Sequence, residues 1–130
     1  MFTTISIKTG NRSDMIDITS RVEEELSKTG IQNGMCFLFV PHTTAGITIN
    51  EGADPSVTVD IQATLEKLIP WEWDYRHLEG NSAAHIKSSL MGHSAIVLVE
   101  SGRLKLGSWQ GIFFCEFDGP RSRKLHLKFQ

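Results

Sequence analysis

Several features that define large protein classes are missing from this chain. Its 13 Lys and Arg residues are balanced by 15 Asp and Glu residues, and no long basic run occurs. We therefore expect no nucleic-acid partner, because binding a phosphate backbone needs a concentrated positive surface. No apolar run approaches the ~20 residues that a membrane-spanning helix needs, so we expect no membrane partner. The first ten residues, MFTTISIKTG, lack the basic and apolar segments of a secretory signal.

Cysteine is scarce: Cys36 and Cys115 are the two in the sequence, and each lies within an apolar run. That setting favours buried free thiols over a disulfide, and we expect a cytoplasmic protein because free thiols are typical of that reducing compartment. Three catalytic motifs are also absent. The chain has no GxxxxGK segment followed by Ser or Thr, no GxGxxG and no GxSxG, which argues against P-loop, dinucleotide and α/β-hydrolase chemistry.

The order of the apolar patterns predicts the fold class. A chain of 130 residues is long enough for one domain with its own core, and we expect residues 1–130 to form it. Strand patterns lie toward both ends and helical patterns in the middle, which favours an α+β fold, here a mixed or antiparallel sheet sandwich with about three helices. The predicted strands are 2–9, 35–41, 45–52, 94–101, 109–117 and 124–129, and the predicted helices are 17–28 or 19–28, 55–69 and 81–92.

Two of these segments carry more specific local patterns. MCFLFVP, residues 35–41, is a continuous apolar run and is expected to be buried on both faces. Asp54 followed by Pro55 predicts a helix start, with the aspartate as the cap and the proline at the first helical position. Asp60 lies inside this helix, at the edge of the face that helical spacing marks as core-facing, where it reaches either solvent or a site.

Polar residues gather at the ends of predicted elements, first in PHTTAGITINEGADP. His42, Thr43 and Thr44 form a turn between two apolar strands, and Glu51 closes the second strand. Residues at strand ends carry function more often than residues in strand interiors. The alternative is structural: the threonines satisfy the backbone of the turn, and Asp54 only caps the helix.

A second polar segment is HLEGNSAAH, which holds His77 and His85. Neutral imidazoles are common ligands of zinc and other divalent ions. Eight positions along one continuous helix would separate the two histidines by ~12 Å, but Gly80 and Asn81 interrupt the helix, so His77 can fold back from a loop. Asn81, Ser82 and the free amides of the helix start are suited to hold an anion such as phosphate. The alternative is that both histidines are structural.

The third polar segment is WQGIFFCEFDGPRSR. Alternate residues of a strand share a face, so Gln110, Glu116 and Asp118 point away from the face of the odd-numbered phenylalanines and the cysteine. Two close carboxylates suit a divalent cation or an acid–base pair. Arg121 and Arg123 follow a Gly-Pro turn and can grip a phosphate. The alternative is an internal ion-pair network that ties two strands together.

Three long segments, PHTTAGITINEGADPSVTVD, HLEGNSAAHIKSSLMG and LGSWQGIFFCEFDGPRSR, resemble motifs of the YjbQ family, in order and over nearly the whole chain. The resemblance implies a small α+β domain that forms a homotrimer, with polar clefts near subunit interfaces. It also implies a site around the three histidines His42, His77 and His85, with Glu51, Asp60, Glu116 and Arg121 nearby. The activity implied is that of a secondary thiamine-phosphate synthase, which joins a pyrimidine methyl diphosphate to a thiazole phosphate and releases diphosphate.

From these observations we expect a metal-dependent enzyme that acts on a small phosphorylated substrate, with a divalent ion, zinc or magnesium, as cofactor. The alternatives are a metal-dependent hydrolase and a non-catalytic trimer that binds a metal or a small ligand. The predicted roles are catalysis for Glu51, Asp60, Glu116 and Asp118; substrate or phosphate binding for Thr43, Thr44, Asn81, Ser82, Gln110, Arg121 and Arg123; and metal binding for His42, His77 and His85.

Overall fold

The strands of the chain form two antiparallel sheets. The computed structural model describes residues 2–130. One sheet has five strands in the order β1-β8-β3-β5-β6, and the other has three in the order β2-β7-β4. All the pairings between these strands are antiparallel, which confirms the predicted α+β class with antiparallel sheets and three helices. The elements are β1 (Thr3–Lys8), β2 (Asp14–Asp17), α1 (Thr19–Ser27), β3 (Gly34–Phe39), β4 (Ala45–Glu51), α2 (Pro55–Leu68), α3 (Ser82–Met91), β5 (Ser94–Glu100), β6 (Arg103–Leu104), β7 (Gln110–Glu116) and β8 (Ser122–Phe129).

Local signals set the ends of the helices. Asp54 caps α2, because its side chain accepts a hydrogen bond of 2.9 Å from the Ser56 amide, and Pro55 takes the first position, as predicted. α3 ends at Gly92, whose φ of 86° suits glycine better than other residues. No helix within residues 2–130 combines the length and the apolar character needed to cross a membrane.

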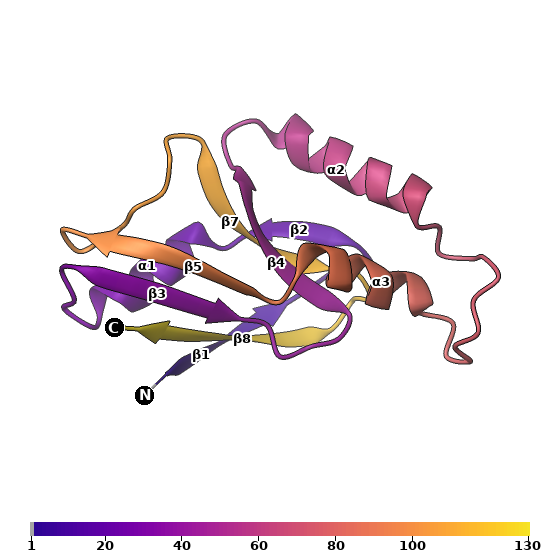
Figure 1. Cartoon of the computed structure of the whole chain (residues 1–130), viewed down its shortest axis with the longest axis horizontal. Coiled ribbons are helices and arrows are strands. Elements are labelled where there is room, and N and C mark those ends of the chain that lie inside the picture. Colours follow the sequence, from indigo (N-terminus) through magenta and orange to yellow (C-terminus); the bar gives the residue numbers. More distant parts are fainter. Residues whose placement is uncertain (1) are drawn as a thin grey trace.

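The main hydrophobic core fills the space between the two sheets and continues onto α1 (Figure 1). β7 contributes Ile112 and Phe114, β3 contributes Leu38, and α1 contributes Val22 and Leu26, all of them at most 1% exposed. Cys36 lies in the same core as a free thiol, as predicted. Burial raises the pKa of this thiol to about 12, so it stays protonated at neutral pH.

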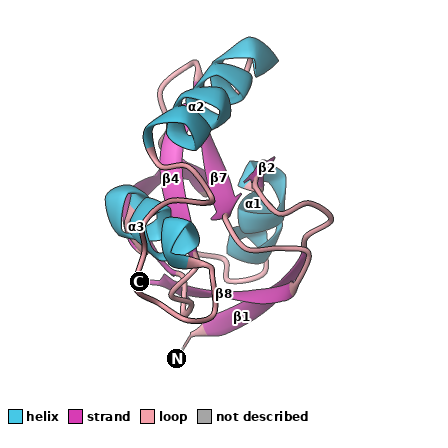
Figure 2. Ribbon diagram, turned by 90° about the vertical axis from the view of Figure 1, so that its right-hand side faces the viewer, coloured by secondary structure: helices cyan, strands magenta, loops and turns pink. Residues whose placement is uncertain are grey.

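A second hydrophobic cluster lies on the other side of the three-stranded sheet. β7 contributes Phe113 and Cys115, and Phe117 follows directly after the strand. Ile61 and Leu65 of α2 pack against this cluster. In Figure 2, α2 stands outside β4 and β7, with α1 and α3 on either side of these strands. β7 is therefore buried on both faces, because the main core covers one face and helices cover the other.

β3 is buried on one face only, so the expectation of burial on both faces for residues 35–41 is wrong. Phe37 and Phe39 are 43% and 46% exposed, because α1 and the second sheet cover only the opposite side of the five-stranded sheet. Ile96 and Leu98 of β5 continue this apolar surface and are 54% and 60% exposed. A continuous apolar run marks a strand, but it does not show how many layers cover that strand.

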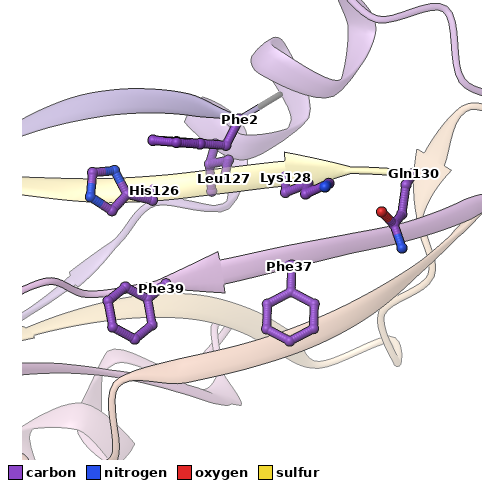
Figure 3. Close-up of a pocket in the computed structure, with 7 residues that line it drawn as sticks. All are labelled: Phe2, Phe37, Phe39, His126, Leu127, Lys128 and Gln130. Atoms are coloured by element: carbon purple, nitrogen blue, oxygen red, sulfur yellow. The ribbon is translucent and has the colours of Figure 1, made fainter.

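Aromatic rings meet on this uncovered side of the sheet. The ring of His126 lies parallel to that of Phe39, with centroids 6.5 Å apart, and Phe2 meets His126 edge-on at 5.0 Å. Figure 3 shows Phe37 and Phe39 on β3 beside His126 on β8, around a hollow of about 410 Å³. We call the surface formed by Phe2, Phe37, Phe39, Ile96, Leu98 and His126 the open sheet face.

Candidate functional site

A polar cleft of about 480 Å³ opens where three connecting segments meet. They are the turn between β3 and β4, the segment that leads into α3, and the turn between β7 and β8. The structure thus brings together parts of all three segments that the sequence marked as polar, with the three predicted histidines and both predicted arginines. The cleft is lined by Pro41, His42, Thr43, Thr44, His77, Glu79, Asn81, His85, Asp118, Arg121 and Arg123.

Arg123 and Glu116 form an ion pair behind the wall of the cleft, and their side chains are 4% and 0% exposed. Glu116 accepts hydrogen bonds from Nη2 of Arg123 and from its Nε, the latter at 2.8 Å. Glu116 also accepts one from Thr9 Oγ1 at 2.7 Å, and Arg123 Nη2 donates to Thr44 Oγ1 at 2.9 Å. A buried ion pair is stable when both partners are hydrogen-bonded in this way.

The pKa of Glu116 is lowered in this setting. Burial alone would raise it, but hydrogen bonds from Arg123, Thr9 and the Asp118 amide hold the carboxylate in its charged form. This favours the internal ion pair, the alternative for this segment, over a direct catalytic role for Glu116. Nε and Nη2 of Arg123 donate hydrogen bonds inside the protein. Nη1 is therefore the guanidinium nitrogen that remains to donate to a ligand in the cleft, which Arg123 lines.

Asp118 connects the β7–β8 turn to the start of α3. Its Oδ2 accepts a hydrogen bond of 2.9 Å from Arg121 Nη2 and one of 2.8 Å from Asn81 Nδ2. Arg121 Nε donates to the backbone carbonyl of Asp118 at 2.8 Å. Asn81 is the N-cap residue of α3, but its side chain binds Asp118 rather than the helix amides. Asp118 therefore holds the guanidinium of Arg121, which is half exposed, at the rim of the cleft.

His42 is held by β8 rather than by the other histidines. Its Nε2 accepts a hydrogen bond of 2.9 Å from the Lys124 amide. Burial and the nearby positive charge of Arg123 lower the pKa of His42, so the ring is neutral at pH 7. A neutral ring that accepts at Nε2 carries its proton on Nδ1. In this geometry His42 offers the cleft an N–H donor.

His77 and His85 lie together, as a shared site requires. Their ring centroids are 5.4 Å apart, and Glu79 Oε2 lies 4.0 Å from His77 Nε2. Zinc in proteins takes three or four protein ligands, and no group of three His, Cys, Asp or Glu side chains suited to a metal ion occurs among residues 2–130. His42 does not complete the set, because one ring nitrogen is bonded and the other is protonated. Within the described residues, the cleft therefore holds a pair of histidines without a third ligand placed to share an ion.

Three predicted residues lie away from the cleft. Glu51 lines a separate hollow at the start of α2, and Asp60 is exposed on that helix. Gln110 pairs with Glu51 in the strand register, and its side chain accepts a hydrogen bond from the Gly107 amide at 2.8 Å. β4 and β7 have their other ends at the cleft, and seven residues of strand span ~20 Å. Strand length therefore separates these side chains from the histidines.

Thr9 and Glu79 belong to the site but lie outside the sequence prediction, and the predicted Ser82 lies beside the cleft. Thr9 follows β1, and nothing in its local sequence indicates that it binds Glu116. Glu79 follows His77 by two positions in a segment already marked as polar, so its place in the sequence could have indicated a role in the site. Ser82 lines a hollow that adjoins the cleft and shares His77 and His85 with it.

The fold and the cleft together define a class: a small α+β domain of two antiparallel sheets, with a cleft of histidines and arginines where its turns meet. Within that class, residues 3–130 match the family described as UPF0047 protein YjbQ-like. The chain belongs to the YjbQ/UPF0047 family, as its three sequence motifs indicated.

Relatives match the chain over almost its full length. It is 56% identical over 129 residues to the UPF0047 protein YugU of Bacillus subtilis, covering 98% of both chains. It is 53% identical over 122 residues to a UPF0047 protein of Methanocaldococcus jannaschii, covering 94% of this chain and 88% of the relative. The crystal structure of an uncharacterized YjbQ/UPF0047 family protein from Clostridium acetobutylicum matches with a TM-score of 0.96 at 55% identity, covering 98% of this chain and 99% of that one.

Proposed function

We propose that the cleft binds the phosphate group of a small molecule and that the protein is an enzyme acting on that molecule. The buried pair of Glu116 and Arg123 carries the proposal. Burying two charges is costly, and apolar side chains would stabilise a strand end equally well. The pair holds the Arg123 guanidinium in one orientation at the cleft, so little conformational freedom is lost when it binds an anion.

Further hydrogen-bond donors surround Arg123. Arg121 lies at the rim, and His42 offers its Nδ1–H. α3 begins beside the cleft, which its N-cap residue Asn81 lines, and helix starts favour anions. Together these groups are suited to hold the oxygens of a phosphate and to stabilise negative charge that develops on a leaving group.

The specific reaction that we propose is the one implied by the family resemblance, that of a secondary thiamine-phosphate synthase. In that reaction diphosphate leaves as an anion, which the arginines and the N–H donors of the cleft would stabilise. Under this proposal Arg121 and Arg123 hold phosphate oxygens. We place the activity in the cytoplasm, where buried free thiols such as Cys36 and Cys115 are typical.

Diphosphate binding to the purified protein, measured by isothermal titration calorimetry, tests the cleft. Arg121→Ala removes a donor at the rim and is expected to weaken binding about tenfold, since a hydrogen bond to a charged group contributes roughly 1.5–3 kcal/mol. Arg103→Ala is the matched control, because Arg103 is an exposed arginine that pairs with Glu23 away from the cleft. Thiamine-phosphate formation from the two precursors is expected to disappear in His85→Ala.

Two results would contradict these proposals. If the wild-type protein binds neither phosphate nor diphosphate, the cleft is not an anion site. If His85→Ala still forms thiamine phosphate at the wild-type rate, the site has been placed wrongly. The predicted zinc or magnesium ion is tested separately, by elemental analysis of the untagged protein and by repeating the assay with a chelator.

We also propose that the protein forms the homotrimer that the resemblance implies. The open sheet face supports this proposal, because monomeric proteins rarely expose a contiguous apolar patch of several large side chains. Aromatic residues are enriched in the buried centres of protein interfaces, and Phe2, Phe37 and Phe39 lie together here (Figure 3). Neighbouring copies of the chain would cover these rings.

A further inference from the structure

An apolar groove lies close to the polar cleft, with one further hollow between them. A hollow of about 340 Å³ shares His77 and His85 with the cleft. That hollow in turn shares Tyr75 and Ile86 with a third one of about 250 Å³, between the end of α2 and the side of α3. The middle hollow therefore adjoins both of the others through shared lining residues. We call the last of them, lined by Leu68, Ile69, Pro70, Trp73, Tyr75 and Ile86, the ring groove.

The ring groove is apolar and already shaped. The Tyr75 hydroxyl donates a hydrogen bond of 2.6 Å to the Pro70 carbonyl, and the rings of Trp73 and Tyr75 meet edge-on with centroids 5.7 Å apart. Leu68 and Trp73 are nevertheless 72% and 73% exposed. Exposed apolar side chains that gather in a hollow beside convergent polar groups are typical of a ligand site.

We propose that the ring groove binds the apolar, aromatic part of the same phosphorylated molecule whose phosphate lies in the cleft. This inference rests on the proposed function and adds a second subsite to it. One molecule is expected to reach both places, because the middle hollow shares His77 and His85 with the cleft and Tyr75 and Ile86 with the ring groove. An aromatic group fits best, since the faces and edges of Trp73 and Tyr75 offer ring contacts in addition to apolar area.

Methyl phosphate and phenyl phosphate are suitable probes, because they carry the same charge and differ in the ring. Titration calorimetry on the full chain is expected to show phenyl phosphate binding about tenfold tighter than methyl phosphate, as burial of most of a ring predicts. Trp73→Ala is expected to remove this preference and to leave methyl phosphate binding unchanged. Ile86→Ala tests the same groove from α3. Trp109→Ala is the matched control, a tryptophan 68% exposed that does not line the groove.

The outcomes separate this inference from the function on which it rests. If both phosphates bind equally, the ring groove is not a subsite, although the cleft still binds phosphate. If neither binds, the proposed phosphate site fails and the inference fails with it. If Trp73→Ala changes the oligomeric state in light scattering and not the preference for the ring, the groove is an interface between copies, and the inference is overturned.

Discussion

β7 and β3 are both apolar inner strands, yet they are buried to different extents. β7 lies between β2 and β4, and β3 lies between β8 and β5. In β7 every residue from 111 to 116 is buried. In β3 burial alternates, with Cys36 and Leu38 inside and Phe37 and Phe39 exposed.

The difference comes from the number of layers that cover each strand. β7 has the main core on one face and the second cluster, with α2 packed against it, on the other. β3 has the main core on one face and the open sheet face on the other. An apolar strand therefore lies either in a central layer of the chain or at its surface, and the predictions below distinguish the two.

The largest expected effect is on the free energy of unfolding when β7 loses a core ring. Phe114→Ala is expected to cost about 3–5 kcal/mol, because Phe114 is fully buried and its removal leaves a cavity. Phe37→Ala on β3 is the comparison, and it is expected to change the stability of the separated monomer little. Urea unfolding at low protein concentration measures both. Equal losses in the two variants would show that both strands are covered on both faces.

Removing the charge at the end of β7 is expected to lower the free energy of unfolding by a similarly large amount. Glu116→Gln leaves the buried Arg123 without its counter-charge, and breaking such a pair costs about 3–5 kcal/mol. Because the pKa of Glu116 is lowered in the folded protein, its contribution is present above the ordinary value of 4.5 and is lost as pH falls through the folded pKa. The wild-type protein should therefore lose stability on acidification below about pH 4.5 more steeply than the variant.

The control for this experiment is Glu100→Gln at the end of β5. Glu100 pairs with Lys105 at 2.6 Å, but both side chains are about 60% exposed. Exposed pairs contribute little to stability, so this variant should unfold like the wild type. If Glu116→Gln also unfolds like the wild type, the buried pair does not stabilise the fold, and its proposed role in holding Arg123 loses its support.

A substitution on the open sheet face is expected to have the smallest effect on the stability of the monomer. Its expected effect is on the assembly of the proposed trimer. Phe39→Asp places a charge among the rings of this face, which is expected to convert the proposed trimer to monomers while the monomer stays folded. Size-exclusion chromatography with light scattering measures the mass. Val59→Asp on α2 is the control, since Val59 is 61% exposed and lies outside this face. A trimer that persists in Phe39→Asp would place the interface elsewhere.

Elements with a strong local signal could be predicted from the sequence, and short elements could not. The cap at Asp54 and the end of α3 at Gly92 each rest on one residue with a specific backbone role, so local chemistry was sufficient. β2 and β6, of 4 and 2 residues, are too short to show a periodic pattern, and they exist because β7 and β5 offer them partners.

The candidate site, too, could be predicted from the sequence only in part. The sequence marked the three segments that line the cleft, because histidines, carboxylates and arginines gather there at the ends of predicted elements. It could not show that Glu51 and Gln110 lie at the far ends of β4 and β7, since that depends on the direction of each strand. Nor could it show that Thr9, 107 positions away from Glu116, binds its carboxylate. Such contacts are set by the packing of the sheets.

In one turn of α3, each of four successive residues contacts a different part of the molecule. His85 lines the cleft, Ile86 lines the ring groove, Lys87 binds Glu66 of α2 at 2.6 Å, and Ser88 donates to a carbonyl of the β3–β4 turn at 2.5 Å. Successive helical residues point about 100° apart, so these four contacts surround the helix. A substitution at any of these four positions is therefore expected to disturb a different neighbour: the cleft, the groove, α2 or the β3–β4 turn.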